Sequence, residues 1–363
     1  MSGAADNEFM ARALKLAERG LFTATPNPRV GCVIVRDVAV IGEGWHERAG
    51  GPHAEVVALR AAGARARGAT AYVTLEPCHH HGRTPPCDEA LIAAGITRVV
   101  AAMLDPDPRT SGQGLARLAQ AGIAVETGVM EEAARLLNRG FVSRVTRGRP
   151  WTRMKIAASI DGKTALLNGK SQWITGEAAR KDGHHWRARA CALMTGIGTV
   201  RDDDPQLTVR SVETTRQPLR VVIDSRLELP LSARILEGGG VLIACAAIDE
   251  PKAAQLKDKG AEIVVLPNAS GKVELPALMQ ELGRRGINEL HIEAGHKLNG
   301  SLVKENCVDE LLVYLAPCLI GEHANGMLDL PELADLADRR TLRIDDLRMI
   351  GGDVRIVAGW EAH

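Results

Sequence analysis

We expect the chain to fold as an α/β protein with two domains, and three features of the sequence predict this. Its 363 residues are enough for roughly two domains, and 45% of them are hydrophobic, as ordinary buried cores require. Helical patterns that end at a glycine and run into a β-rich segment are typical of α/β layers with largely parallel strands. Four such transitions occur, at Gly95, Gly122, Gly260 and Gly286. The basic segment RVTRGRPW, which follows a helical stretch over 131–144, places the domains at 1–146 and 150–363.

The N-terminal half begins with a helix and a hairpin. Apolar residues recur at helical spacing from Met10 to Leu21, TPNPR then breaks the helix, and VGCVIV and VAVIGEGW have the pattern of two strands. The segment HAEVVALRAAG starts a second helix with His53 and Glu55 in its first turn. Next, TAYVTL is a strand that leads to Cys78, and CDEALIAAG opens a further helix at Cys87.

The C-terminal half continues the alternation. MKIAASIDGKTA runs from a buried strand into a polar loop, and SQWIT precedes a helix that contains Arg187. The strand CALMTG is followed by GTVRDDDPQLTVR, whose dense charge is unnecessary for folding. LRVVIDS and ELHIEAG are strands that end in carboxylates, at the sheet edge where α/β proteins bind ligands.

Charge and composition exclude several classes of protein. Lysine plus arginine and aspartate plus glutamate number 45 each, so nothing in the net charge favours nucleic acid or an anionic membrane, and we expect a small-molecule partner. The N-terminus lacks the pattern of a signal peptide and no apolar run approaches a membrane span, which predicts a cytoplasmic protein.

The seven cysteines do not form the pattern of a disulfide framework. Two of them, Cys78 and Cys87, lie in polar, turn-rich sequence and are candidate metal ligands. We expect the others to pack as buried thiols because they lie in or beside apolar segments: Cys32, Cys191, Cys245, Cys307 and Cys318.

A zinc site accounts for the residues around these two cysteines. The imidazole of His53 and the thiolates of Cys78 and Cys87 are good zinc ligands, and three protein ligands leave the fourth position for a water. Zinc lowers the pKa of such a water to about 7. Glu55, which is not needed as a ligand, is placed to take the water's proton and pass it to a leaving amine.

Other interpretations stay open on the residues alone. A lone HxE on a helix is common, and Cys78 and Cys87 could belong to a structural zinc site with a fourth ligand from the run His79, His80 and His81. Against this, consecutive residues cannot all point at one ion, and a closed site would leave Glu55 without a role. In the second half no clean GxGxxG is present, and GIGTVR is a weak cofactor signal by itself.

The combination of HAE, PC and a downstream cysteine is that of the zinc-dependent nucleobase deaminases. Their common form has two residues between the cysteines, whereas eight separate Cys78 from Cys87. With TPNPRVG, GWH and EPC-x-H-x-G-x-TPPC, this spacing resembles the bifunctional deaminase-reductase family of riboflavin biosynthesis, and the resemblance covers essentially the whole chain. It implies a cytidine-deaminase-like three-layer domain followed by a dihydrofolate-reductase-like domain that uses NADPH without a Rossmann motif.

The resemblance also implies two reactions. The first domain, with one Zn²⁺ per chain, would remove the 2-amino group of 2,5-diamino-6-hydroxy-4-(5-phosphoribosylamino)pyrimidine. The second would reduce the ribosyl group with NADPH to give 5-amino-6-(5-phosphoribitylamino)uracil. We expect a homo-oligomer.

The resemblance assigns site residues by position. In the first domain, His53, Cys78 and Cys87 are zinc ligands, Glu55 is catalytic, Asn27 and His46 contact the substrate base, and Arg83 handles the phosphate. In the second, the cofactor positions are Ala157, Trp173, Thr199, Asp203, Ser225 and Gly295. Its substrate positions are Lys155, Asp161, Ser171, Arg187, Leu207, Arg210 and Glu293.

Simpler interpretations exist for several of these residues. Taken alone, Asn27 between two prolines is a turn residue, His46 is a surface histidine at a strand end, and Trp173 is a core or interface residue. Any one arginine is more often a solvated surface charge.

Two other functions compete with the two-step enzyme. A nucleic-acid base deaminase requires a basic face and stacking aromatics, but the net charge is zero and only 3% of residues are aromatic. A non-catalytic, zinc-stabilised binding protein would be unaffected by Glu55→Gln.

Overall fold

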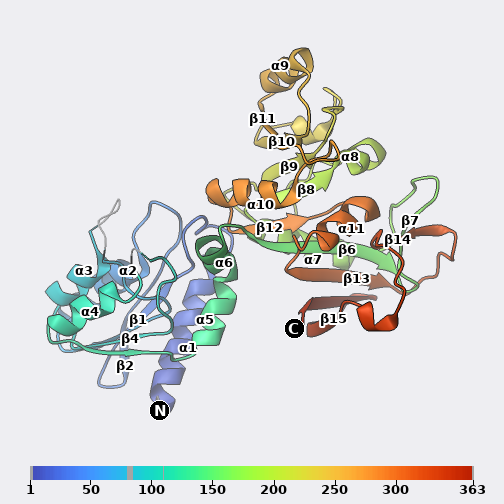
Figure 1. Cartoon of the computed structure of the whole chain (residues 1–363). Coiled ribbons are helices and arrows are strands. Elements are labelled where there is room, and N and C mark those ends of the chain that lie inside the picture. The colour runs from blue at the N-terminus through green and yellow to red at the C-terminus, as the bar shows by residue number, and fades with distance from the viewer. Residues whose placement is uncertain (1–2, 80–84, 109, 362–363) are drawn as a thin grey trace. The chain divides into compact units, whose positions relative to one another are not determined.

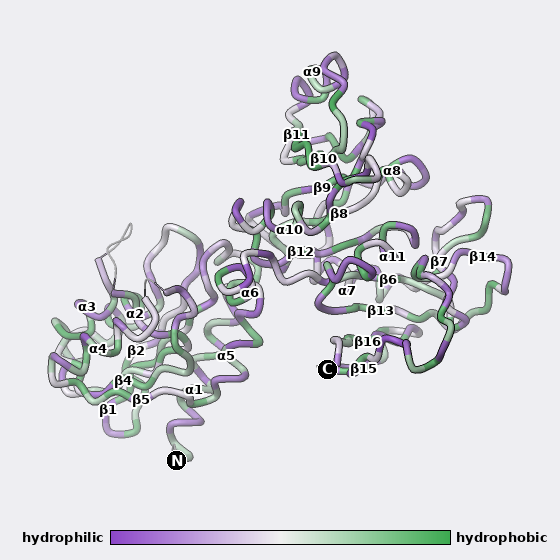
Figure 2. Tube along the Cα trace, viewed as in Figure 1, coloured by the Kyte–Doolittle hydropathy of each residue, from purple (hydrophilic) through white to green (hydrophobic). Residues whose placement is uncertain are grey.

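The computed structural model describes residues 3–79, 85–108 and 110–361. The chain forms two compact units, Met1–Gly148 and Arg149–His363, and each has its own sheet (Figure 1). Hydrophobic stretches follow the strands of both sheets, and hydrophilic stretches are frequent in the connecting loops (Figure 2). Among the described residues, no helix combines the length and the apolar character that crossing a membrane would need.

The first unit contains one five-stranded sheet in the order β2-β1-β3-β4-β5. Strands β1 and β2 form the expected antiparallel hairpin, β3 pairs antiparallel with β1, and β3, β4 and β5 are parallel. In chain order the elements are α1 (Ala4–Glu18), β1 (Gly31–Arg36), β2 (Ala39–Trp45), α2 (Ala54–Ala62), η1 (Gly63–Ala66), β3 (Thr70–Val73), α3 (Cys87–Ala93), β4 (Arg98–Ala101), α4 (Gln113–Gln120), β5 (Ala124–Thr127), α5 (Glu131–Leu137) and α6 (Arg139–Arg147).

Glycines bring two helices close to opposite faces of this sheet. Gly31 in β1 lies under α1, where an added Cβ would be 2.0 Å from the Ala13 carbonyl oxygen. Gly44, which pairs with the next residue of β1, lies under α2, where a Cβ would be 2.4 Å from the Ala54 carbonyl oxygen. Neighbouring strand residues point to opposite faces, so the unit has three layers, with α3 and α4 continuing the layer of α2.

Two sequence predictions for this unit differ in outcome. The glycines after α3 and α4, Gly95 and Gly122, have φ of 73° and 83° and lead into strands as expected. The stretch 131–144, however, is two helices that are separated at Asn138. The Asn138 side chain accepts from the backbone N–H of Arg29 (2.8 Å) and donates to its carbonyl (2.9 Å), which fixes the break.

The second unit contains a nine-stranded sheet in the order β11-β10-β9-β8-β12-β6-β13-β16-β15. Its first seven strands are parallel, and β16 and β15 pair antiparallel at one edge. The elements are β6 (Trp151–Ser159), β7 (Lys163–Leu166), α7 (Glu177–Arg189), β8 (Ala192–Gly196), α8 (Ile197–Asp203), β9 (Leu219–Ile223), η2 (Arg234–Leu236), β10 (Val241–Cys245), α9 (Glu250–Asp258), β11 (Ala261–Val265), α10 (Leu275–Arg284), β12 (Glu289–Ile292), α11 (His296–Lys304), β13 (Glu310–Ala316), β14 (Ala324–Gly326), η3 (Leu336–Asp338), β15 (Leu342–Ile350) and β16 (Asp353–Trp360).

Alternate residues of these strands contribute to different cores. Met194 in β8 belongs to the core formed with α10 and α11, whereas its neighbour Leu193 belongs to the core formed with α8 and α9. Gly260 and Gly286 end α9 and α10 with positive φ, as predicted. The sheet is therefore covered on both faces, and the α/β fold class is confirmed.

The prediction for the cysteines is wrong at one position. Cys32, Cys191, Cys245 and Cys307 are buried, but Cys318 is exposed because it follows Pro317 in the loop after β13.

Candidate functional site

The structure brings the three predicted zinc ligands together. His53 is the N-cap of α2, Cys87 is the first residue of α3, and Cys78 follows β3. One ligand atom from each lies within 4.8 Å of the others. The His53 Nδ1 atom is 3.2 Å from the Cys87 sulfur and 3.5 Å from the Cys78 sulfur. Around a tetrahedral zinc, such nitrogen and sulfur atoms are separated by about 3.5 Å, so this donor set fits the ion.

Glu55 completes this arrangement without acting as a ligand of the set. It lies in the first turn of α2, and its side chain is buried. Its Oε2 atom has no hydrogen-bond partner among the described residues, a costly situation that a zinc-bound water would relieve. Burial raises the pKa of Glu55 to about 7.

The two ends of the loop between the cysteines are fixed by hydrogen bonds. The Cys78 carbonyl accepts from the backbone N–H groups of Cys87 (3.1 Å) and Asp88 (3.3 Å). His79 Nδ1 lies 2.6 Å from the buried carboxylate of Asp88. His79 is therefore engaged away from the ligand set. His80, His81 and Arg83 lie outside the described residues.

A buried glutamate that we did not single out from the sequence supports this site. The Glu76 carboxylate accepts hydrogen bonds from the backbone N–H groups of Asp105, Gly112, Gly114 and Leu115. It thereby fixes the segment that leads into α4. Because Glu76 is two residues before Cys78, the same contact anchors the chain that carries this ligand.

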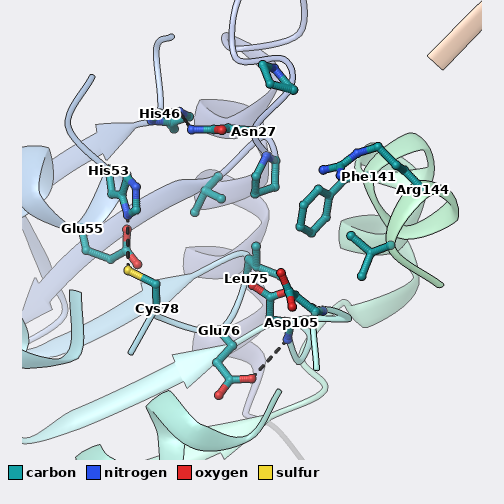
Figure 3. A pocket seen from close by; sticks show the side chains of 15 residues that line it. Asn27, His46, His53, Glu55, Leu75, Glu76, Cys78, Asp105, Phe141 and Arg144 are labelled. Carbon is teal, nitrogen blue, oxygen red and sulfur yellow. Dashed lines mark hydrogen bonds between the residues drawn. The ribbon is translucent and has the colours of Figure 1, made fainter. Parts of the chain in front are cut away.

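A cavity of about 240 Å³ opens beside the ligand set (Figure 3). His46 and Asn27 line it, with Asn27 Nδ2 3.0 Å from His46 Nε2 and the Pro52 carbonyl 3.0 Å from His46 Nδ1. His46 is buried, so the interpretation as a surface histidine is wrong. Sequence reasoning missed several lining residues, because they lie in the connection after β4, in the helical stretch predicted over 131–144 and in the segment taken as a linker: Asp105, Asp107, Phe141, Arg144 and Val145.

In the second unit, the structure brings Lys155, Arg187 and Glu293 together. Glu293 follows β12, and its carboxylate accepts from Arg187 Nε (2.5 Å) and Nη2 (2.9 Å). The Nζ atom of Lys155, a residue of β6, is 4.0 Å from the Glu293 Oε2 atom. Burial alone would raise the pKa of Glu293, but Arg187 holds it well below its usual range. Burial lowers the pKa of Lys155.

Arg187 connects this cluster to two further predicted substrate positions. Its Nη1 atom donates to the carbonyl of Thr208 (3.2 Å), which lies between the buried Leu207 and the exposed Arg210. Arg210 Nη1 donates to the Thr208 hydroxyl (2.9 Å). Arg187 is thus not a solvated surface charge, and the loop after α8 is tied to the Glu293 cluster.

The predicted cofactor positions fall at the ends of neighbouring strands. Gly295 is the N-cap of α11, and a Cβ there would lie 3.8 Å from the Thr199 hydroxyl of α8. Ser225 follows β9, where its hydroxyl accepts from the Val273 N–H (3.2 Å). Ala157 lies in β6.

Three other predicted residues have distinct surroundings. The Ser171 hydroxyl donates to the Asp203 carboxylate (2.9 Å), which joins a predicted substrate position to a predicted cofactor position. Trp173 is 70% exposed, so it is not a core residue, and the Arg180 guanidinium lies 4.7 Å from its ring. Asp161 accepts from the Ser159 hydroxyl and from the N–H groups of Ile320 and Gly321, which makes it a loop anchor.

Comparison with known proteins matches both units. Residues 4–103 match the cytidine and deoxycytidylate deaminase zinc-binding region, and residues 150–356 match the RibD C-terminal domain. The riboflavin biosynthesis protein RibD of Escherichia coli is 48% identical over 361 residues, which is 96% of this chain and 98% of that protein. The chain belongs to the RibD family.

Solved structures of RibD proteins agree with this assignment. RibD of Acinetobacter baumannii is 43% identical, has a TM-score of 0.92, and is covered over 99% of each chain. A protein of Thermotoga maritima is 32% identical with a TM-score of 0.87, over 98% of this chain and 99% of that one. It is described as a diaminohydroxyphosphoribosylaminopyrimidine deaminase and 5-amino-6-(5-phosphoribosylamino)uracil reductase. As a RibD-family member, the chain is a bifunctional deaminase and reductase of riboflavin biosynthesis, with a zinc-binding deaminase unit and a reductase unit that uses NADPH.

Proposed function

We propose that the first unit deaminates 2,5-diamino-6-hydroxy-4-(5-phosphoribosylamino)pyrimidine in the cavity beside His53, Cys78 and Cys87. The observation that carries this proposal is the convergence of the three ligand atoms next to an unpartnered, buried oxygen of Glu55. When bound, zinc supplies the nucleophile by lowering the pKa of a water ligand.

The remaining steps belong to residues of the chain. Glu55 takes a proton from the water, whose oxygen adds to C2 of the ring, and delivers this proton to the 2-amino group, so that the C2–N bond breaks and ammonia leaves. Asn27 and His46 bind the polar edge of the base, and their mutual hydrogen bond fixes the orientation of both side chains. Phe141 and Leu75 line the cavity and limit the access of bulk water.

We propose that the second unit reduces the ribosyl side chain of the deaminated product around Lys155, Arg187 and Glu293. When bound, NADPH supplies the hydride. Arg187 and Arg210 suit the phosphate because guanidinium groups form paired, charge-assisted hydrogen bonds with it. The Glu293 carboxylate accepts hydrogen bonds from sugar hydroxyls. The cofactor lies against five predicted positions: Ala157, Thr199, Asp203, Ser225 and Gly295.

The decisive test separates the two reactions. We expect Glu55→Gln to lower ammonia release from the diaminopyrimidine roughly 10²- to 10⁴-fold, because the proton shuttle is lost. NADPH oxidation with the deaminated substrate should continue at the wild-type rate. The matched control is Glu132→Gln, a change at an exposed position of α5, which should leave both activities intact. Joint loss of both activities, or loss of neither, would overturn the two-site proposal.

We also propose that the protein works as a homo-oligomer in the cytoplasm. A reducing compartment suits the Cys78 and Cys87 thiols. Strand β15 lies at the edge of the large sheet, and a register shift between Ile344 and Asp346 keeps four exposed apolar side chains on one face: Leu342, Ile344, Leu347 and Met349. Exposed apolar patches of this kind mark protein contacts, and we assign this one to a second copy of the chain.

A further inference from the structure

The end of the deaminase cavity away from the zinc ligands is formed by α6. Phe141, Arg144 and Val145 from this helix line the cavity, and Figure 3 shows the Arg144 side chain extended over Phe141 toward it. Among the described lining residues, Arg144 is the only lysine or arginine. The cavity therefore has a cationic group at one end and the zinc ligands at the other.

In the described part of the chain, the other charged side chains that line the cavity are acidic. Asp105 and Asp107 lie there together with Glu55 and Glu76. The Glu76 carboxylate accepts from backbone N–H groups, and Asp105 accepts from the Asp107 N–H (2.8 Å). Carboxylates can accept from ribose hydroxyls or amino groups, but they repel a phosphate. An anionic group of a ligand is thus directed to Arg144.

Arg144 is held in place by its surroundings. Its guanidinium carbon lies 5.6 Å from the centre of the Phe141 ring, within the range of a cation–π contact. Helix α6 starts directly after Asn138, whose side chain is bonded to both backbone groups of the buried Arg29. This anchoring reduces the conformational entropy that Arg144 loses when it binds an anion.

We infer that Arg144 binds the phosphate of the deaminase substrate and thereby selects phosphorylated pyrimidines. The inference rests on the proposed function of the first unit. A substrate whose base lies at His53 and Cys78 carries its phosphate at the far end of the ribose, in the direction of α6. The guanidinium matches phosphate geometry through two parallel hydrogen bonds. Arg83, which the family resemblance assigns to the same phosphate, comes from the loop between the cysteines, so the two arginines belong to different segments.

The test compares phosphorylated and dephosphorylated substrates. We expect Arg144→Gln to raise KM for the phosphorylated diaminopyrimidine roughly 10- to 100-fold with kcat changed less than about 3-fold, since a charged hydrogen-bond pair to the substrate is lost. The ribosyl analogue without phosphate should be deaminated equally well by wild type and variant. Arg144→Lys should restore part of the affinity, because the charge remains but the paired geometry does not.

Arg135→Gln is the matched control, because Arg135 is exposed on the neighbouring α5 and pairs with Glu131 (2.7 Å) outside the cavity. It should leave KM unchanged. Zinc content and the melting temperature of each variant identify any change in folding. If Arg144→Gln lowered activity equally with the phosphorylated and the dephosphorylated substrate, or left KM for the phosphorylated one unchanged, the inference would be overturned.

A binding measurement separates this inference from the proposed function. We expect calorimetry with ribose 5-phosphate to show affinity for the Arg210→Gln protein, whose reductase site has lost one of the two arginines assigned to the phosphate there, and a loss of roughly 10-fold or more when Arg144→Gln is added. This result reports on Arg144 even for a substrate that is not deaminated. Equal ribose 5-phosphate affinity in both backgrounds would contradict the assignment of Arg144.

Discussion

At the scale of single residues, a buried charged group joins α1 to the sheet of the first unit. Asp6 accepts hydrogen bonds from both terminal nitrogens of Arg98 (2.8 and 2.9 Å) and from the Tyr72 hydroxyl (2.7 Å). Arg98, helped by Tyr72, lowers the pKa of Asp6 to about 2. The ionised carboxylate is therefore favoured in the folded state.

This linkage predicts an acid-dependent stability. A carboxyl whose pKa falls from about 4 in the unfolded chain to about 2 in the folded one stabilises the fold above pH 4, and this contribution disappears as the pH falls through 2. We expect Asp6→Asn to lower the free energy of unfolding at pH 7 by about 1–3 kcal/mol and to remove part of the wild-type loss between pH 4 and 2. Urea unfolding at a series of pH values measures both.

The control for this prediction is Asp37→Asn. The Asp37 side chain is 94% exposed, and its contact with Arg36 is an ion pair at 3.8 Å. The pH dependence of the free energy of unfolding should therefore be the same in Asp37→Asn as in the wild type. A parallel pH dependence in Asp6→Asn and wild type would contradict the assignment to Asp6.

The residues of the metal site could be predicted because sequence motifs place them. His53 and Glu55 share one helix turn, and each cysteine adjoins a predicted element, so their convergence followed from chemistry and family pattern. Glu76 and Arg144 could not be identified in this way. The partners of Glu76 are backbone N–H groups about 30 to 40 residues away, and Arg144 faces the cavity only because of the packing of α6.

At the scale of elements, helix α1 depends on its close approach to β1. A Cβ at Gly31 would lie 2.0 Å from the Ala13 carbonyl oxygen and 2.8 Å from the Ala17 nitrogen, so helix and strand must separate to admit it. The contact lies in the main core of the unit, where Ala13 and Val33 are buried. Small residues here are a geometric requirement of the packing.

We therefore expect Gly31→Ala to destabilise the protein by about 1–3 kcal/mol or more through overpacking, as measured by chemical denaturation. Gly183→Ala is the control, because, apart from the chain neighbours and the backbone of α7 itself, no atom of the described residues lies within 4 Å of a Cβ at this position. Alanine is the better helix former by about 1 kcal/mol, so this variant should be neutral or more stable. A Gly31→Ala protein as stable as wild type would show that α1 can move away without cost.

The prediction of helices and strands succeeded where the spacing of the apolar residues and the glycine that ends a helix indicate the same boundary. It failed for the stretch 131–144, because the apolar pattern continues through Asn138 while a side-chain contact with Arg29, more than 100 residues earlier, ends the helix there. Propensity and periodicity report on neighbours along the chain, and this break is a tertiary effect.

At the scale of the whole molecule, the α/β class could be predicted but the order of the strands could not. Helix-to-strand transitions indicate parallel neighbours, whereas the central place of β12 and β6 in the nine-stranded sheet depends on pairings between segments more than 130 residues apart. The antiparallel edge of β16 and β15 carries the exposed apolar face to which we assign the contact with a second copy.

That assignment predicts the assembly state. We expect Leu347→Glu to shift the sedimentation coefficient from that of an oligomer to that of a 38.8 kDa chain, because a charge would be buried without a partner in the contact. Arg348→Glu on the opposite face of β15 is the control and should leave the assembly intact. An oligomer that resists Leu347→Glu would mean that copies of the chain associate through another surface.

The hydrogen bonds that fix Cys78 to Cys87 and Asp88 also make the intervening segment exchangeable. Both ends of the segment are held by the protein's own backbone and by the contact of His79 with Asp88, so each cysteine is held by contacts made outside residues 80–85. A designer can therefore treat residues 80–85 as a cassette that leaves the N-cap of α3, Pro86, unchanged. Libraries inserted there would vary the ligands that the protein accepts while the contacts that hold Cys78 and Cys87 remain.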